Sequence, residues 1–130
     1  MGVYVDTSAL ARVLLAEPDS QAVLDGLADF DRRVSSRLLG LELRRVALGE
    51  DLEKEADALL ADVALVPIDD AILESAETAL PANIATLDAI HLVTALRLAQ
   101  GGDVDAFMTY DAQLAAGAAH YGIQVIAPTG

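Results

Sequence analysis

The chain has no cysteine, no tryptophan and only one lysine among its 130 residues. Without cysteine it forms neither disulfide bonds nor a thiolate metal site. Basic residues number eight against 21 acidic ones, and the formal net charge of −13 disfavours simple electrostatic capture of nucleic acid. Such a charge favours cations and basic partners. Five arginines nevertheless lie between positions 32 and 45, which leaves room for a local positive patch.

Long hydrophobic runs are also missing. Hydrophobic residues make up 54% of the chain, yet no apolar run reaches the roughly 18–20 residues of a membrane span. No basic residue precedes the first strand pattern, so we expect no signal peptide and a cytoplasmic protein. The length predicts one domain over residues 1–130. A mean hydropathy of +0.40 predicts apolar surface that a homodimer or another partner covers.

Short apolar runs alternate with helical patterns, which predicts an α/β fold with a mostly parallel sheet of about five short strands. The expected strands are residues 3–5, 33–35, 63–68, 105–109 and 124–126. The expected helices begin near residues 7, 19, 37, 52, 69, 86 and 112, and the one from residue 69 extends to about residue 80. We expect Thr7 or Ser8, Asp69 and Thr86 to be helix caps.

Four carboxylates interrupt apolar stretches of the chain: Asp6, Glu42, Asp88 and Asp111. An acid on an apolar face is costly to bury unless a cation meets it. Asp6 directly follows one expected strand and Asp111 lies just past the end of another, and the carboxyl ends of parallel strands face the ligand site in open α/β sheets. Glu42 and Asp88 lie on the inner faces of expected helices. These positions can converge at one site.

Each acid also has a structural explanation. The two strand-end acids fit as helix caps, and this is the favoured reading of Asp111 taken alone. Glu42 fits a salt bridge to Arg45. Asp88 fits a favourable interaction with a helix N-terminus, worth about 0.3–1 kcal/mol. His91, one turn after Asp88, we interpret as structural rather than catalytic.

Considered together, the four acids favour a metal site. Two bare carboxylates about 5 Å apart repel by roughly 3 kcal/mol at an effective dielectric near 20, and a divalent ion removes that cost. Oxygen ligands without clustered cysteine or histidine favour Mg²⁺ or Mn²⁺ over Zn²⁺. Carboxylate–Mg²⁺ sites are typical of phosphoryl and phosphodiester chemistry.

Four sequence blocks resemble those of the PIN-domain family and, within it, of VapC-type toxins. They are residues 3–10 (VYVDTSAL), 35–45 (SSRLLGLELRR), 87–95 (LDAIHLVTA) and 109–111 (TYD), and the segment 123–126 resembles the closing strand of the family. Each block is weakly specific. Their order and their spread over nearly the whole chain make the combined resemblance strong.

The resemblance implies a three-layer α/β/α fold and a Mg²⁺-dependent endoribonuclease, the toxin of a type II VapBC-type toxin–antitoxin system. It implies Asp6 and Asp88 as the principal Mg²⁺ ligands, with Glu42 and Asp111 completing the acidic site. Supporting hydrogen bonds would come from Thr7, Ser8 and Thr109. The implied substrates are structured RNAs such as tRNA or rRNA. The implied partner is a VapB-like antitoxin, through which alone the toxin meets DNA.

The residues leave other readings open. A phosphatase that forms an aspartyl-phosphate needs a second acid two residues after Asp6, where this chain has Ser8. A receiver domain needs a lysine late in the chain, and the only lysine is Lys54. Both classes are therefore disfavoured. A catalytically silent PIN-like module that acts only by binding a protein partner is the remaining alternative.

Overall fold

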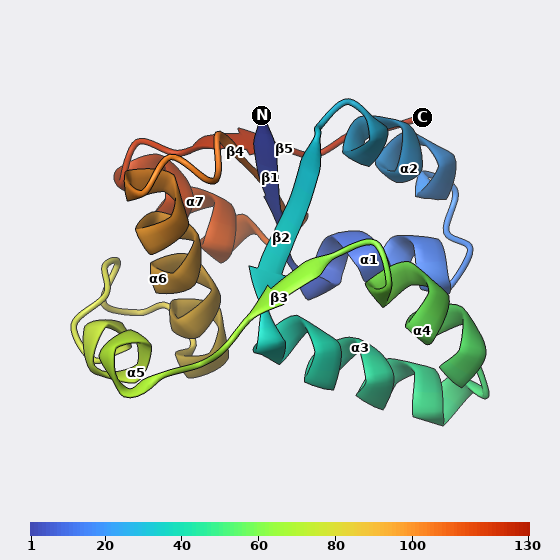
Figure 1. Cartoon of the computed structure of the whole chain (residues 1–130), viewed down its shortest axis with the longest axis horizontal. Helices are drawn as coiled ribbons and strands as arrows, with labels where there is room; N and C mark the ends of the chain where they lie inside the picture. Colours follow the sequence, from blue (N-terminus) through green and yellow to red (C-terminus); the bar gives the residue numbers. More distant parts are fainter.

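Five short parallel strands form the central sheet, and seven helices cover it (Figure 1). The computed structural model describes all residues from 1 to 130. The strands are β1 (Gly2–Val5), β2 (Arg32–Ser36), β3 (Ala64–Val66), β4 (Ala106–Met108) and β5 (Gln124–Ile126). The helices are α1 (Thr7–Leu14), α2 (Ser20–Ala28), α3 (Arg37–Glu50), α4 (Glu53–Leu60), α5 (Asp70–Ala76), α6 (Thr86–Gln100) and α7 (Ala112–His120).

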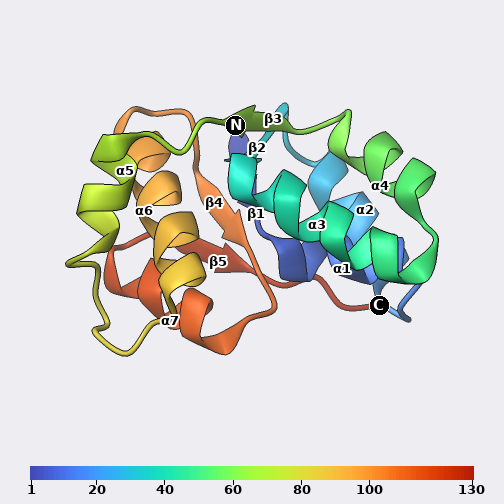
Figure 2. The same cartoon turned by 90° about the horizontal axis from the view of Figure 1, so that it is seen from below.

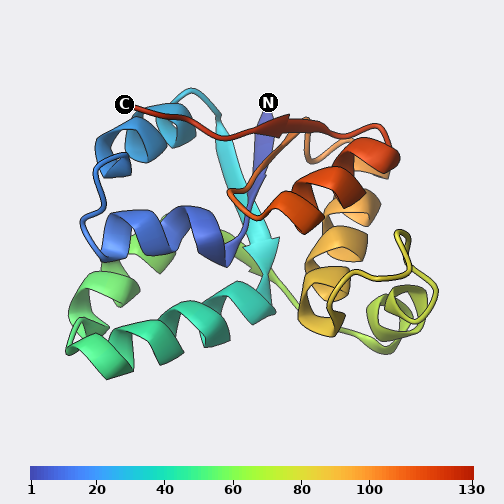
Figure 3. The same ribbon diagram turned by 180° about the vertical axis from the view of Figure 1, so that it is seen from behind.

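The strand order is β3-β2-β1-β4-β5, and every neighbouring pair is parallel. Helices α1–α4 cover one face of the sheet and α5–α7 the other, as Figures 1 and 3 show from opposite sides. Figure 2 shows the same separation from below. The predicted α/β class, the three layers and the mostly parallel sheet of about five strands are confirmed.

Strand β1 lies at the centre of the sheet and is buried throughout. Its side chains alternate between two cores because successive residues of a strand point to opposite faces. Val3 and Val5 pack in the larger core with residues of α1–α4. Tyr4 packs in the second core with Phe107 and residues of α6 and α7. A strand covered on both faces is expected to be apolar throughout, as this one is.

The parallel arrangement brings the ends of β1 and β4 together at one edge of the sheet. Val5 is in register with Met108, and the Asp6 amide donates a 3.3 Å hydrogen bond to the Met108 carbonyl. Asp6 and Thr109, which follow these two strands, are therefore neighbours although 103 residues separate them. Asp105 lies at the opposite end of β4, where it accepts a hydrogen bond from the Gly2 amide.

Several local predictions were wrong. Asp6, rather than Thr7 or Ser8, caps α1 by accepting from the Ala9 amide. Ala85 occupies the N-cap of α6, so Thr86 is the first helical residue and not a cap. Helix α5 ends at Ala76 and turns follow it, because the backbone ahead of Pro81 is biased away from helix. Strands β3 and β4 are shorter than expected.

The Asp69 cap is confirmed by a 2.9 Å bond from the Ile72 amide. No helix has the length and apolarity needed to cross a membrane.

Candidate active site

Asp6 is the buried acid at the end of β1, with only 3% of its surface exposed. Its Oδ1 atom accepts hydrogen bonds from Ser8 Oγ at 2.7 Å and from the Ala9 amide at 3.2 Å. Its Oδ2 atom accepts from Thr109 Oγ1 at 2.6 Å. The carboxylate therefore caps α1 and is held by two hydroxyl groups at the same time.

The two hydroxyl groups also accept hydrogen bonds from the loop that follows β4. The Tyr110 amide donates to Ser8 Oγ at 2.9 Å, and the Asp111 amide donates to Thr109 Oγ1 at 3.0 Å. Because each hydroxyl accepts from an amide, its own proton is free to point at Asp6. The predicted supporting residues Ser8 and Thr109 thus fix both oxygens of the buried carboxylate.

Burial raises the pKa of Asp6 above its ordinary value, and the hydrogen bonds from Thr109 and Ser8 only partly oppose this effect. No arginine or lysine forms an ion pair with Asp6. A buried carboxylate with hydrogen bonds but without a counter-ion is the environment that a bound cation stabilises.

Glu42 lies on α3 and is hydrogen-bonded through one oxygen. Thr7 Oγ1 donates to Glu42 Oε1 at 2.7 Å, and His91 Nε2 lies 2.8 Å from the same atom. Glu42 Oε2 has no hydrogen-bond partner in the structure. The alternative salt bridge to Arg45 is absent. Burial raises the pKa of Glu42, but the hydrogen bonds from His91 and Thr7 outweigh it, so the net shift is downward.

A buried network of hydrogen bonds extends from Glu42 into the second core. His91 is 2% exposed, and its Nδ1 atom lies 2.7 Å from the hydroxyl of Tyr4. Burial raises the pKa of Tyr4, so the phenol keeps its proton. The arrangement that satisfies every group has Tyr4 donating to His91 Nδ1, with His91 Nε2–H donating to Glu42, a tautomer assigned from the network.

The network of hydrogen bonds from Glu42 through His91 to Tyr4 was not predicted from the sequence. His91 was interpreted as structural and Tyr4 was placed only in the first expected strand; both are buried. The available signal was the placement of His91 three residues after Asp88 on the same helix. The partner of His91 was not visible in the sequence, because Glu42 is 49 residues away along the chain.

Asp88 lies in the first turn of α6 and is half-buried. Its side chain makes no hydrogen bond in the structure. Burial raises its pKa, the charge of Asp111 adds to the rise, and the charges of Asp6 and Glu42 add further, while His91 opposes them. Asp88 therefore feels the charges of all three other acids. We call Asp88 and the three acids whose charges reach it the acidic centre.

Asp111 serves as the N-cap of α7. Its Oδ1 atom accepts a 2.9 Å hydrogen bond from the Leu114 amide, which confirms the structural reading. The cap does not remove the residue from the acidic centre, because its charge is the largest electrostatic influence on Asp88. Capping and participation in the centre are compatible, as they are for Asp6.

The acidic centre suits a hard cation. No three acidic or histidine side chains converge as a ready-made metal cage. Mg²⁺ is usually bound by one or two carboxylates, with waters and substrate phosphates as further ligands, so it does not need such a cage. The buried Asp6 and the unpaired Asp88, both with raised pKa values, fit this requirement. An all-oxygen set matches Mg²⁺ or Mn²⁺ rather than Zn²⁺.

Comparison with known proteins identifies the family to which this fold belongs. The family model of the PIN domain matches residues 3–119. The chain belongs to the PIN domain family. It is 39% identical to Ribonuclease VapC46 of Mycobacterium tuberculosis (strain ATCC 25618 / H37Rv), over 98% of each chain. It is 32% identical to Ribonuclease VapC47 of Mycobacterium tuberculosis (strain CDC 1551 / Oshkosh), over 97% of this chain and 96% of the relative. The resemblance to VapC-type toxins is thereby confirmed.

Solved structures show the same fold at lower sequence identity. One is a toxin–antitoxin complex from Klebsiella pneumoniae, with a TM-score of 0.73, 19% identity and 97% of each chain covered. Another is VapC20 of Mycobacterium tuberculosis, described as a toxin that cleaves the sarcin–ricin loop. It has a TM-score of 0.75 and 16% identity, over 97% of this chain and 99% of that one.

Proposed function

We propose that this protein is a Mg²⁺-dependent endoribonuclease, the toxin of a VapBC-type toxin–antitoxin system. Its reaction is hydrolysis of phosphodiester bonds in structured RNA such as tRNA or rRNA, leaving 5′-phosphate and 3′-hydroxyl ends. The observation that carries the proposal is the buried Asp6 carboxylate, which the hydroxyls of Ser8 and Thr109 hold in place and which no cationic side chain meets. The relatives named Ribonuclease VapC support the same reaction.

Asp6 and Asp88 are the proposed principal ligands of Mg²⁺, with Mn²⁺ as a substitute. When bound there, the cation supplies positive charge for the scissile phosphate and acidifies a water molecule. Ser8 and Thr109 hold Asp6 in one orientation, so the ligand does not have to reorganise when the cation binds. Asp88 has no hydrogen bond to break before it becomes a ligand.

Glu42 and Asp111 complete the centre. Thr7 and His91 both hold Oε1 of Glu42, which leaves Oε2 as the oxygen free to accept a hydrogen bond from the attacking water or to approach a cation. Oδ1 of Asp111 accepts the capping hydrogen bond of α7, and Oδ2 is free to take part in the site. The proposed role of each is to position water and to hold negative charge next to the two principal ligands.

The direct test is cleavage of tRNA and rRNA, with the new RNA ends mapped, by wild type and by Asp6→Asn. The substitution keeps the size and the capping oxygen but removes the charge, so we expect cleavage to be abolished while the fold persists. Asp105→Asn is the matched control, because Asp105 lies at the opposite end of the neighbouring strand. Cleavage by Asp6→Asn at the wild-type rate contradicts the proposal.

A VapB-like antitoxin is the proposed protein partner. The structural similarity to a toxin–antitoxin complex supports it. We also propose a cytoplasmic homodimer, because large apolar side chains such as Leu73 on α5 and Leu87 on α6 are exposed. Co-expression with the product of the adjacent small reading frame, followed by light scattering of the purified protein alone and in complex, tests both. If the protein is a monomer and does not bind that product, both the homodimer and the antitoxin partner are contradicted.

A further inference from the structure

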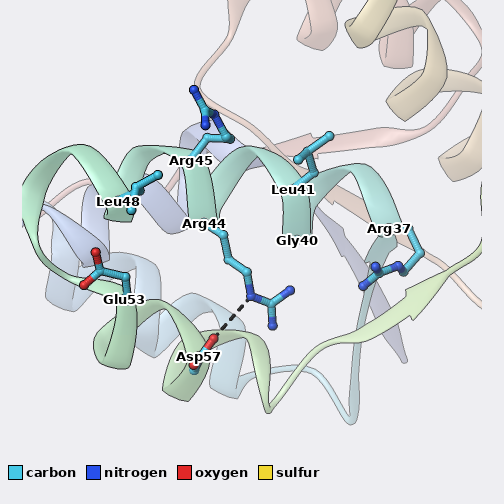
Figure 4. A pocket seen from close by; sticks show the side chains of 8 residues that line it. All are labelled: Arg37, Gly40, Leu41, Arg44, Arg45, Leu48, Glu53 and Asp57. Atoms are coloured by element: carbon cyan, nitrogen blue, oxygen red, sulfur yellow. Dashed lines mark hydrogen bonds and ion pairs between the residues drawn. The ribbon is translucent and has the colours of Figure 1, made fainter.

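We propose that Arg37 and Arg44, which converge over Gly40 on α3, bind a phosphodiester group of the RNA substrate away from the acidic centre. They lie in a groove of about 580 Å³ between α3 and α4. Figure 4 shows both guanidinium groups on the same side of α3, next to Gly40. The inference rests on the proposed ribonuclease function and adds to it a binding site for the substrate backbone.

The two guanidinium groups approach each other beside Gly40. A Cβ atom at this position would lie 3.3 Å from Arg44 Nη1 and 3.7 Å from Arg37 Nη1, so the two nitrogens are at most about 7 Å apart. Two guanidinium groups this close repel each other in the absence of an anion. An anion between them removes the repulsion and receives hydrogen bonds from both.

Glu53 and Asp57 also line the groove, but only Arg44 of the two arginines forms an ion pair. Arg44 uses Nε to contact Asp57 Oδ1 at 3.2 Å, which leaves its outer nitrogens free, and Arg37 forms no ion pair or hydrogen bond. Arg37 is also the first residue of α3, whose first turn has no acidic residue. A helix N-terminus disfavours cations and favours anions, so both features suit a negatively charged ligand.

A phosphodiester fits this site because guanidinium groups match the geometry of phosphate oxygens. A third cation extends the positive surface towards the acidic centre. Arg45 lies about 60° from Glu42 around the axis of α3, whereas Arg37 and Arg44 lie about 140–160° from it. Figure 4 shows Arg45 pointing to the side opposite Arg37 and Arg44. Cations spaced around one helix match the repeated phosphates of a polyanion better than a single carboxylate.

The groove also contains Leu41 and Leu48, which are 61% and 58% exposed. These leucines suit an acidic protein segment, which is the competing occupant. The test therefore compares a short oligouridylate with polyglutamate. Binding of each is measured by fluorescence anisotropy over a salt series with Mg²⁺ present, in an Asp6→Asn background that prevents cleavage.

The variant is Arg37→Gln/Arg44→Gln. We expect it to weaken oligouridylate binding about tenfold, and to make the slope of log Kobs against log salt less negative by about 0.7, the value for one phosphate of a single strand. Arg37→Lys/Arg44→Lys keeps the charge and should retain the slope. The matched control is Arg32→Gln/Arg97→Gln, which removes two exposed, ion-paired arginines outside the groove.

Equal losses in the groove variant and in the control overturn the proposal, because general charge then explains the effect. Loss of polyglutamate binding with unchanged oligouridylate binding also overturns it and identifies an acidic protein segment as the occupant. The proposed function is tested separately, in the chain with Asp6 intact. If wild type cleaves RNA and the groove variant binds and cleaves it equally well, only the anion site is wrong. If wild type cleaves no RNA, the ribonuclease proposal fails while the binding series still decides the groove.

Discussion

His91 Nε2 lies 2.8 Å from Glu42 Oε1, which links a buried histidine of α6 to an acid of α3. The same oxygen accepts from Thr7, and the other ring nitrogen of His91 contacts Tyr4. The orientation of Glu42 is therefore set by residues from three different elements of the fold. Partners of this kind typically change metal affinity or activity 10–100-fold when they are removed.

His91→Leu should lower cleavage by about 10–100-fold, because Glu42 loses one of the two donors that fix its orientation. The variant also leaves the Tyr4 hydroxyl buried without a partner, which should cost about 1–3 kcal/mol of unfolding free energy. Initial cleavage rates and urea denaturation measure the two effects. His120→Leu is the control, because His120 is the only other histidine and is exposed on α7. Retention of activity by His91→Gln, which keeps a donor, would support the positioning role over simple packing.

Tyr4→Phe removes one hydroxyl group from the same hydrogen-bond network. It keeps the aromatic packing against Phe107, whose ring centroid is 4.8 Å away. His91 Nδ1 then loses its donor, and we expect a destabilisation of about 1–2 kcal/mol with a smaller activity loss than in His91→Leu. Thermal unfolding and cleavage rates provide the measurements. An activity loss equal to that of His91→Leu would contradict this order, since Tyr4 contacts Glu42 only through His91.

Thr109→Val should affect both Asp6 and the loop after β4. The substitution removes the donor to Asp6 Oδ2 and the acceptor of the Asp111 amide. Because both partners are wholly or partly buried, we expect a loss of about 1–3 kcal/mol in unfolding free energy and a fall in Mn²⁺ affinity measured by calorimetry. Thr94→Val is the control: Thr94 is also buried, but its hydroxyl bonds only to the Ile90 carbonyl. Comparable metal affinity in the two variants would argue against a role for Thr109 in holding Asp6.

The sequence was sufficient to predict the parallel sheet and to single out the four acids as candidates, because both depend on local signals. Apolar runs of three to five residues mark strands such as β1, and an acid directly after such a run is visible as an exception. Asp6 was correctly placed at the end of β1 for this reason, whereas β4 ends at Met108, three residues before Asp111. The double role of each acid, as a cap and as part of the acidic centre, follows from the same position.

Long-range pairings were not predictable in the same way. One reading of Glu42 was a salt bridge to an arginine such as Arg45, whereas its partners are Thr7 and His91, which lie 35 and 49 residues from it in the sequence. The convergence of Arg37 and Arg44 was not predictable either, because it depends on the rotamers of the two side chains. The caps of α1 and α6 were misassigned because several polar residues near each helix start compete for the role.

Asp88→Asn should stabilise the cation-free protein at neutral pH while it lowers activity. The folded-state pKa of Asp88 is raised, by burial first and then by the charge of Asp111. A raised carboxyl pKa gives a stabilising contribution that is present below the unfolded-state pKa and is lost as pH rises through the folded-state pKa. At neutral pH the charged Asp88 therefore destabilises the fold, and asparagine relieves that effect. Thermal unfolding in EDTA should give a higher Tm for Asp88→Asn than for wild type at pH 7, with the difference vanishing in strong acid.

Added Mg²⁺ should raise the Tm of wild type above that of Asp88→Asn. Binding only to the folded state stabilises it by about 2.7 kcal/mol at a ligand concentration 100 times Kd, so wild type gains stability that Asp88→Asn lacks. Thermal unfolding with increasing Mg²⁺ or Mn²⁺ measures the gain in stability. Asp105→Asn is the control and should gain as much stability as wild type, because Asp105 lies at the opposite end of β4. Equal gains in wild type and Asp88→Asn would mean that the cation does not use Asp88. The raised pKa would then reflect only burial and the crowding of acids.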